Sequence, residues 1–305
     1  MGKKSRKNRA HDTPPAGMSR RQAKLAARAA ERARLAGNPR PFAGVPAEAD
    51  LIALREFVSS ATAPVEVAGA ERGIRLCTVL PGGGAAVTRA AEHGGGALVA
   101  LQTRDRSTDA AADLARALDW ARAAGDGEVL DSAVTGAAPA LAELLTGVDP
   151  AAIEVHGDFA WWLPPGADAA AAGPEIRAAA EAIVPAHRVA AEVPGAVWWA
   201  DPGERAHLRW VRPEDPAALL DALARVHAAD HLSLGEGTKF AGVFRVAGVL
   251  VPVWDVDRDA PADSWAAAVA AGERRIAAAL AETGPLDAAG RKSRETILSR
   301  QVTLT

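Results

Sequence analysis

The chain has 305 residues, of which 49% are apolar and 24% are charged. Such a composition is typical of soluble globular proteins, and the length allows one large domain or two ordinary ones. The single cysteine excludes a disulfide framework and any zinc site built from several cysteines, and it favours the reducing cytoplasm. We expect no membrane association, because no segment approaches the ~20 consecutive apolar residues of a membrane helix and the basic start lacks the apolar region of a secretory signal.

Basic and acidic residues are distributed unequally along the chain. Residues 1–40 contain 12 Lys or Arg and two acidic residues, a net charge of +10; the totals of 35 and 38 leave 23 basic and 36 acidic residues, a net charge of −13, for residues 41–305. We therefore predict a disordered or helical basic arm and linker over residues 1–44 that contacts the phosphates of RNA, the ribosome or DNA. The alternative is an arm that folds on the acidic body. The arm residues assigned to phosphate contacts are Lys3, Lys4, Arg6, Lys7, Arg9, Arg20, Arg21, Lys24 and Arg28.

The first folded part is predicted over residues 45–148. Apolar residues at helical spacing predict three helices, and short apolar runs between glycine clusters predict three strands. The expected helices cover residues 48–59, 109–124 and 138–145, and the expected strands cover residues 65–68, 74–80 and 97–103.

The second folded part is predicted over residues 149–284, with a polar tail over 285–305. Asp215 and Pro216 are typical of a helix N-cap and first helical residue. Two apolar runs around Ala247 and Gly248 predict a tight hairpin. The remaining strands are expected at 153–156, 159–163, 197–200 and 208–211, and the helices at 174–184, 216–230 and 264–282. The whole is an α+β fold, with two halves of mixed or antiparallel sheets covered by helices.

The loop at residues 234–239, just before the hairpin, is the candidate rim of a ligand pocket in this half. Its glycines suit positive φ, and its lysine is one of two outside the arm. The Walker spacing is absent, so this is no phosphate loop, and we assign no catalytic residue. The candidate ligand residues are His227, Gly235, Gly237, Lys239 and Asp255.

No metal or cofactor is expected. His227 and His231 are four residues apart, which suits zinc, but no third ligand can be assigned and a helix-end role is preferred. The acidic run at 255–259 does not match a calcium loop, because Gly and Glu are missing at the required positions.

Two tryptophan doublets stand on expected strands, at Trp161-Trp162 and Trp198-Trp199. Adjacent strand residues face opposite sides, so one Trp of each pair should be nearer solvent. An exposed Trp could stack on a nucleobase or form a protein-binding patch.

A family resemblance rests on residues 234–257 (LGEGTKFAGVFRVAGVLVPVWDVD), preceded by HLRWV at 207–211 and LLDALARVHA at 219–228. This pattern resembles an actinobacterial family of unknown function, domain-of-unknown-function family 5926, from about Phe42 to the end of the expected helix at 282. The resemblance implies no activity. Some relatives carry a cysteine-rich zinc motif like the one that ends the translocase SecA, and this chain lacks the cysteines for it.

Three functional hypotheses follow. The first is a non-enzymatic binding or adaptor protein whose arm contacts RNA, ribosomes or DNA. The second is a protein–protein interaction module that uses exposed Trp and an acidic face. The third is a small-molecule-binding protein or enzyme with a pocket near Lys239.

Overall fold

The computed structural model of the chain describes residues 38–163, 173–300 and 302–303. By internal contacts the chain divides between Pro39 and Arg40, and both sheets belong to the unit Arg40–Thr305. The nine arm residues assigned to phosphate contacts lie outside the described residues.

The first sheet is mixed. Its strands run in the order β5-β3-β4-β2-β1-β6, with β7 also paired to β1. The pair β2–β4 is parallel, and the other pairs are antiparallel. The strands are β1 (Ala61–Val67), β2 (Ile74–Val79), β3 (Ala86–Thr88), β4 (Ala97–Gln102), β5 (Val129–Leu130), β6 (Leu145–Val148) and β7 (Glu154–Val155). Its helices are α2 (Glu48–Glu56), α3 (Ala110–Ala123) and α4 (Leu141–Leu144).

The second sheet has the order β13-β11-β12-β10-β9-β8. Five strands are antiparallel, and β13 joins the edge parallel to β11. The strands are β8 (Ala186–Arg188), β9 (Ala196–Ala200), β10 (Ala206–Val211), β11 (Lys239–Val246), β12 (Val249–Val256) and β13 (Val302–Thr303). The helices of this part are α5 (Pro174–Glu181), α6 (Pro216–Ala228), α7 (Ala266–Leu280) and α8 (Ala288–Ser299).

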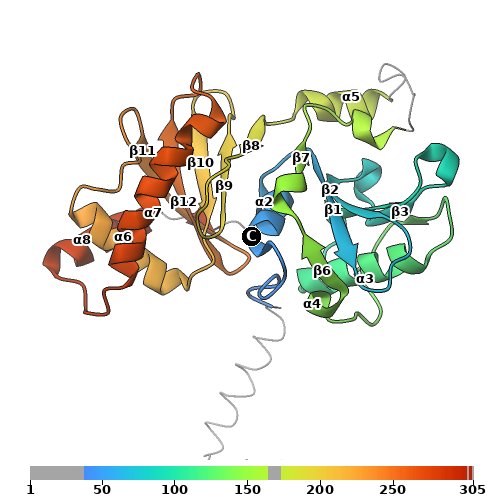
Figure 1. Ribbon diagram of the computed structural model, residues 1–305, viewed down its shortest axis with the longest axis horizontal. Coiled ribbons are helices and arrows are strands. Elements are labelled where there is room, and N and C mark those ends of the chain that lie inside the picture. The colour runs from blue at the N-terminus through green and yellow to red at the C-terminus, as the bar shows by residue number, and fades with distance from the viewer. Residues whose placement is uncertain (1–37, 164–172, 301, 304–305) are drawn as a thin grey trace, which may run out of the picture. The chain divides into compact units, whose positions relative to one another are not determined.

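Both faces of the second sheet contribute side chains to a hydrophobic core, because successive residues of a strand point to opposite sides. Leu208 and Trp210 of β10 face a core shared with α6, α7 and α8. Val211 and Trp198 face the other way and join the core of the first sheet, to which α2 also contributes. Figure 1 shows α6 and α7 on one side of the second sheet and α2 between the two sheets.

The α+β class with mixed and antiparallel sheets is confirmed. The helix cap expected at Asp215 is also confirmed, because its side chain accepts hydrogen bonds from backbone N–H groups in the first turn of α6. The Asp109 side chain caps α3 in the same way. The predicted hairpin is β11–β12. Its two turn residues, Ala247 and Gly248, both have positive φ, which suits the right-handed twist of a strand pair.

Two expectations differ from the structure. The strand expected at 159–163 is wrong: residues Ala160–Trp162 form a 3₁₀ turn that begins where the Asp158 carboxylate accepts a hydrogen bond from the Ala160 N–H. This turn lets both Trp161 and Trp162 pack on the same small core, whereas a strand would separate them. The segment expected to be a polar tail contains α8, whose Ile297 is buried in the second core.

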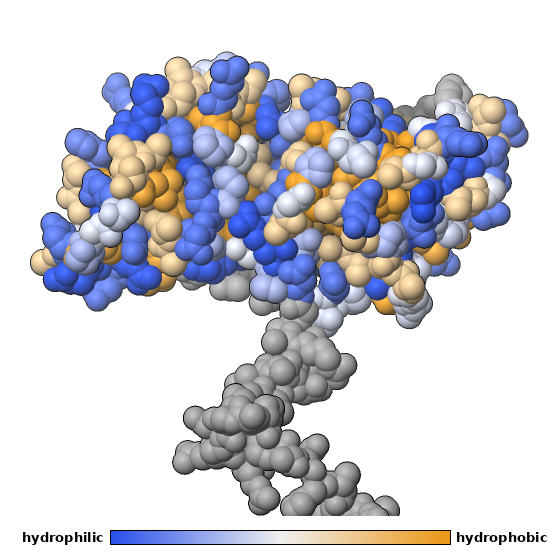
Figure 2. Space-filling view, turned by 60° about the horizontal axis from the view of Figure 1, so that its bottom comes forward, coloured by the Kyte–Doolittle hydropathy of each residue, from blue (hydrophilic) through white to orange (hydrophobic). Residues whose placement is uncertain are grey.

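The surface mixes polar and apolar side chains. On the face drawn in Figure 2, hydrophilic side chains predominate and apolar atoms appear in separate patches between them. Within the described residues, no helix combines the length and the apolar character needed to cross a membrane.

Candidate functional site

The ligand residues expected from sequence do not form one site. The Nδ1 atom of His227 lies 3.0 Å from the Ser293 hydroxyl of α8, within the helical layer. Gly235 and Gly237 lie on an exposed loop. Asp255 alternates with Trp254, which packs against the helices, so Asp255 faces the opposite side of the sheet from His227. Over the described ranges, no group of three His, Cys, Asp or Glu side chains could hold a metal ion.

A groove opens on the face of the second sheet that Asp255 shares. It has a volume of about 500 Å³, within the roughly 300–1,000 Å³ of ligand pockets. One wall comes from the end of α2, and the floor comes from β10, β11 and β12. We call it the Arg209 groove; it is lined by Glu56, Phe57, His207, Arg209, Ala241, Gly242, Val243, Phe244, Val253 and Arg300.

Arg209 is the central cation of this groove. Its guanidinium carbon lies 5.2 Å from the centroid of the Phe57 ring, a distance at which a cation is attracted to an aromatic face. No carboxylate or hydrogen-bond acceptor among the described residues pairs with the guanidinium. Burial lowers the pKa of Arg209, and no acidic neighbour among the described residues opposes that effect. Arg209 is thus a half-buried positive charge that no acidic group in the described part of the chain neutralises.

His207 lies two residues before Arg209 and faces the same groove. Its Nδ1 atom is 3.0 Å from Oδ1 of Asp255, and Arg205 lies 3.9 Å from the other oxygen of that carboxylate. A histidine oriented through Nδ1 leaves its Nε2 atom for a ligand. Lys239, the lysine expected at a pocket rim, is the register partner of Asp255 on β11, and neither residue is part of the groove lining.

Glu56, the acidic residue in the lining, already has a cationic partner. The carboxylate of Glu56 lies 3.5 Å from Nε of Arg55. Arg300, by contrast, has no ion pair within the part of the chain that the structure describes. The unmatched charges of the groove are therefore positive, which favours an anionic ligand.

The described lining residues include no hydroxyl or thiol side chain. Among these lining residues, nucleophilic catalysis through a serine, threonine or cysteine side chain therefore has no candidate. What the side chains can do is bind an anion at Arg209, offer or accept a proton at His207 Nε2, and exclude water with Phe57 and Phe244.

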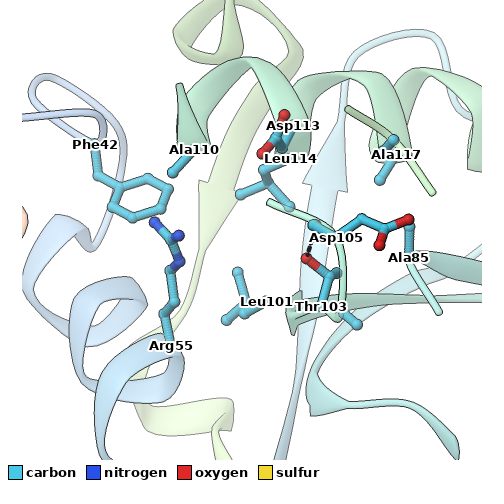
Figure 3. A pocket seen from close by; sticks show the side chains of 12 residues that line it. Phe42, Arg55, Ala85, Leu101, Thr103, Asp105, Ala110, Asp113, Leu114 and Ala117 are labelled. Carbon is cyan, nitrogen blue, oxygen red and sulfur yellow. Dashed lines mark hydrogen bonds between the residues drawn. The ribbon is translucent and has the colours of Figure 1, made fainter. Parts of the chain in front are cut away.

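A second cavity lies at the carboxyl end of β4, a position where open α/β sheets often bind ligands. Arg55 of α2 extends into it beside Phe42, while Thr103, Asp105 and Asp113 line the other side (Figure 3). Arg55 stacks 5.8 Å from the Phe42 ring centroid, and burial lowers its pKa. The cavity measures about 20 Å³, which holds a single water. It is too small for a larger ligand.

The tryptophan hypothesis depends on an exposed ring. All eight Trp lie in the described part of the chain, and each is buried or half-buried. Trp161 donates from Nε1 to the Ser60 hydroxyl, and the Trp162 ring is covered by Arg89 at 5.2 Å. A binding surface made of exposed Trp therefore receives no support.

His207 and Arg209 were not singled out from the sequence. The signal was available in β10, where AHLRWV alternates His and Arg with Leu and Trp. Two polar residues, one of them an arginine, on the same face of an otherwise apolar strand point to a polar site, provided that the strand lies in the middle of its sheet.

Residues 41–305 match the family model described as a family of unknown function, DUF5926. No curated protein gives a significant match, and no solved structure does. The matched region begins one residue after the division between Pro39 and Arg40, so the match covers almost the whole unit Arg40–Thr305 and leaves out residues 1–40.

Proposed function

We propose that this chain, which belongs to the DUF5926 family of unknown function, binds a small anionic ligand in the Arg209 groove. The carrying observation is that Arg209 is half-buried on a sheet face without a carboxylate partner among the described residues. Removing a charge from water is unfavourable unless the charge is paired. A ligand anion would supply that pair.

The test compares the substitution of Arg209 with that of an arginine outside the groove. We would titrate acetate, benzoate and inorganic phosphate at constant ionic strength and follow backbone amide NMR shifts. We expect saturable shifts with at least one anion, centred on β10–β12, and their loss in Arg209→Met. The matched control is Arg274→Met, because Arg274 is exposed on α7, on the other side of the sheet, and has no partner among the described residues. Absence of saturable binding, or equal binding by Arg209→Met, would overturn the proposal.

The uneven distribution of charge along the chain supports a second function. The +10 of residues 1–40, against −13 for the rest, favours an arm that contacts RNA, ribosomes or DNA, with the folded unit as an adaptor. Each phosphate contact releases a counterion, so binding should weaken steeply as salt rises.

Binding of a labelled single-stranded RNA and a DNA duplex should be compared for the full chain and a chain that begins at Arg40. We expect salt-dependent binding by the full chain alone. Equal binding by the shortened chain would remove the arm from this role. A variant with Lys3, Lys4, Arg6 and Lys7 changed to Gln keeps the length and tests charge directly.

A further inference from the structure

The Arg209 groove has one polar side and one apolar side. The cations Arg209 and Arg300 and the free edge of His207 supply the polar side. The apolar side comes from Phe57, Phe244 and Val253. The two phenylalanine rings meet edge to face, with centroids 6.1 Å apart, which fixes both rings in place.

The edge of the floor is shaped by a backbone irregularity. The register of β11 on β12 shifts between Phe240 and Gly242, and Gly242 has a φ of 148°. A Cβ at Gly242 would meet the Arg300 carbonyl oxygen at 3.2 Å, so a side chain would crowd this position. Bulges of this kind often lie beside binding sites, where they redirect side chains. Here the bulge puts two small residues, Ala241 and Gly242, in the lining, and these leave room for a ligand.

The charges favour an anion of low charge. Glu56 lines the same groove, and although Arg55 matches it, its carboxylate repels a dianion more than a monoanion. The Arg209 guanidinium lies 5.2 Å from the centroid of the Phe57 ring, and a planar guanidinium can donate two parallel hydrogen bonds to the two oxygens of a carboxylate.

We propose that the ligand is an amphipathic monocarboxylic acid whose carboxylate pairs with Arg209 and whose apolar chain lies against Phe57, Phe244 and Val253. This inference rests on the proposed anion-binding function and adds the class of ligand. Recognition comes from two parts of one molecule, and neither part alone fills the groove.

The experiment uses the full chain and the series acetate, butanoate, hexanoate and octanoate, followed by the same NMR shifts. Each buried methylene should raise affinity by roughly two- to fourfold until the apolar wall is covered. Octylamine carries the same chain with the opposite charge and should not bind. Phe244→Leu should reduce the gain from acetate to octanoate, whereas Arg274→Met should leave the whole series unchanged.

The outcomes separate the two proposals. If acetate binds through Arg209 and the longer acids gain nothing, the amphipathic ligand is wrong and the anion site stands. If inorganic phosphate binds more tightly than octanoate, the ligand class is likewise wrong. If octylamine binds as well as octanoate, or if Arg209→Met binds the acids unchanged, both proposals fail. Thermal unfolding of each variant shows whether lost binding reflects lost folding.

Discussion

The guanidinium of Arg188 donates two hydrogen bonds to the carboxylate of Asp50, from Nε at 2.8 Å and from an Nη at 3.1 Å. The pair joins α2, beside the first sheet, to β8 at the edge of the second. The Asp50 side chain is only 4% exposed and also accepts a hydrogen bond from the Trp198 indole. Since α2 ends at Glu56 and Phe57 is its C-cap residue, this ion pair helps to fix one wall of the Arg209 groove.

Removing the cation of this pair should be costly. In Arg188→Met the Asp50 carboxylate would stay buried without its ion partner, and breaking a buried pair in this way costs roughly 3–5 kcal/mol. We expect a decrease of that order in the free energy of unfolding, measured by urea denaturation. Arg258→Met is the control, because the Arg258–Asp201 pair has a half-exposed arginine and should contribute about 1 kcal/mol or less.

The loss of stability in Arg188→Met should depend on pH. Burial raises the pKa of Asp50 above its ordinary 3.8, and the Arg188 guanidinium opposes that rise. Without Arg188 the pKa of Asp50 in the folded protein increases further, so Asp50 keeps a proton in the folded state that it releases in the unfolded chain. Stability then falls as pH rises from 3.8 through the raised pKa. The deficit should be small in acid and largest at neutral pH; a deficit independent of pH would contradict this account.

Arg209→Met should not cost much stability. The substitution removes a half-buried cation that has no counter-charge, and it loses a cation–aromatic contact of roughly 0.5–1 kcal/mol. We expect the free energy of unfolding to stay within about 1 kcal/mol of wild type or to rise. A decrease of several kcal/mol in urea denaturation would indicate a structural role for Arg209.

Cys77 should resist thiol reagents in the folded protein. It lies on β2 with 1% of its surface exposed, and burial raises the pKa of its thiol, so little reactive thiolate forms. Because the chain has one cysteine, the yield of a colorimetric thiol reaction reports this site alone. We expect no rapid labelling in buffer and one equivalent in denaturant. Rapid labelling in buffer would contradict the buried position.

Gly195→Ala should be more destabilising than Gly203→Ala. Both glycines have positive φ, which costs roughly 1 kcal/mol or more for a residue with a side chain. At Gly195, however, the new Cβ would lie 1.9 Å from the Val211 carbonyl oxygen, whereas the space at Gly203 is open. Thermal unfolding should therefore show a clearly larger loss for Gly195→Ala, and equal losses would exclude the steric contribution.

Local sequence patterns were sufficient for many of the elements. The N-caps at Asp109 and Asp215, the hairpin turn at Ala247-Gly248 and the alternation of β10 depend on residues close together in the chain, so they can be read without the fold. The 3₁₀ turn at Ala160–Trp162 could not, because the adjacent indoles gain burial by packing on Cys77, Leu80, Leu98 and Ala100 of the first sheet.

The sequence by itself determined the α+β class, the caps and turns, and the excess of basic residues in positions 1–40 over an acidic remainder, because charge and periodicity are properties of neighbouring residues. Only the tertiary structure decided that His207 and Arg209 lie in a groove beside Phe57, while His227 belongs to the helical layer behind the sheet. The physical reason is that a strand pattern shows which residues share a face and does not show what covers that face. Here α2, from the other half of the fold, covers part of it and leaves Arg209 in the open part.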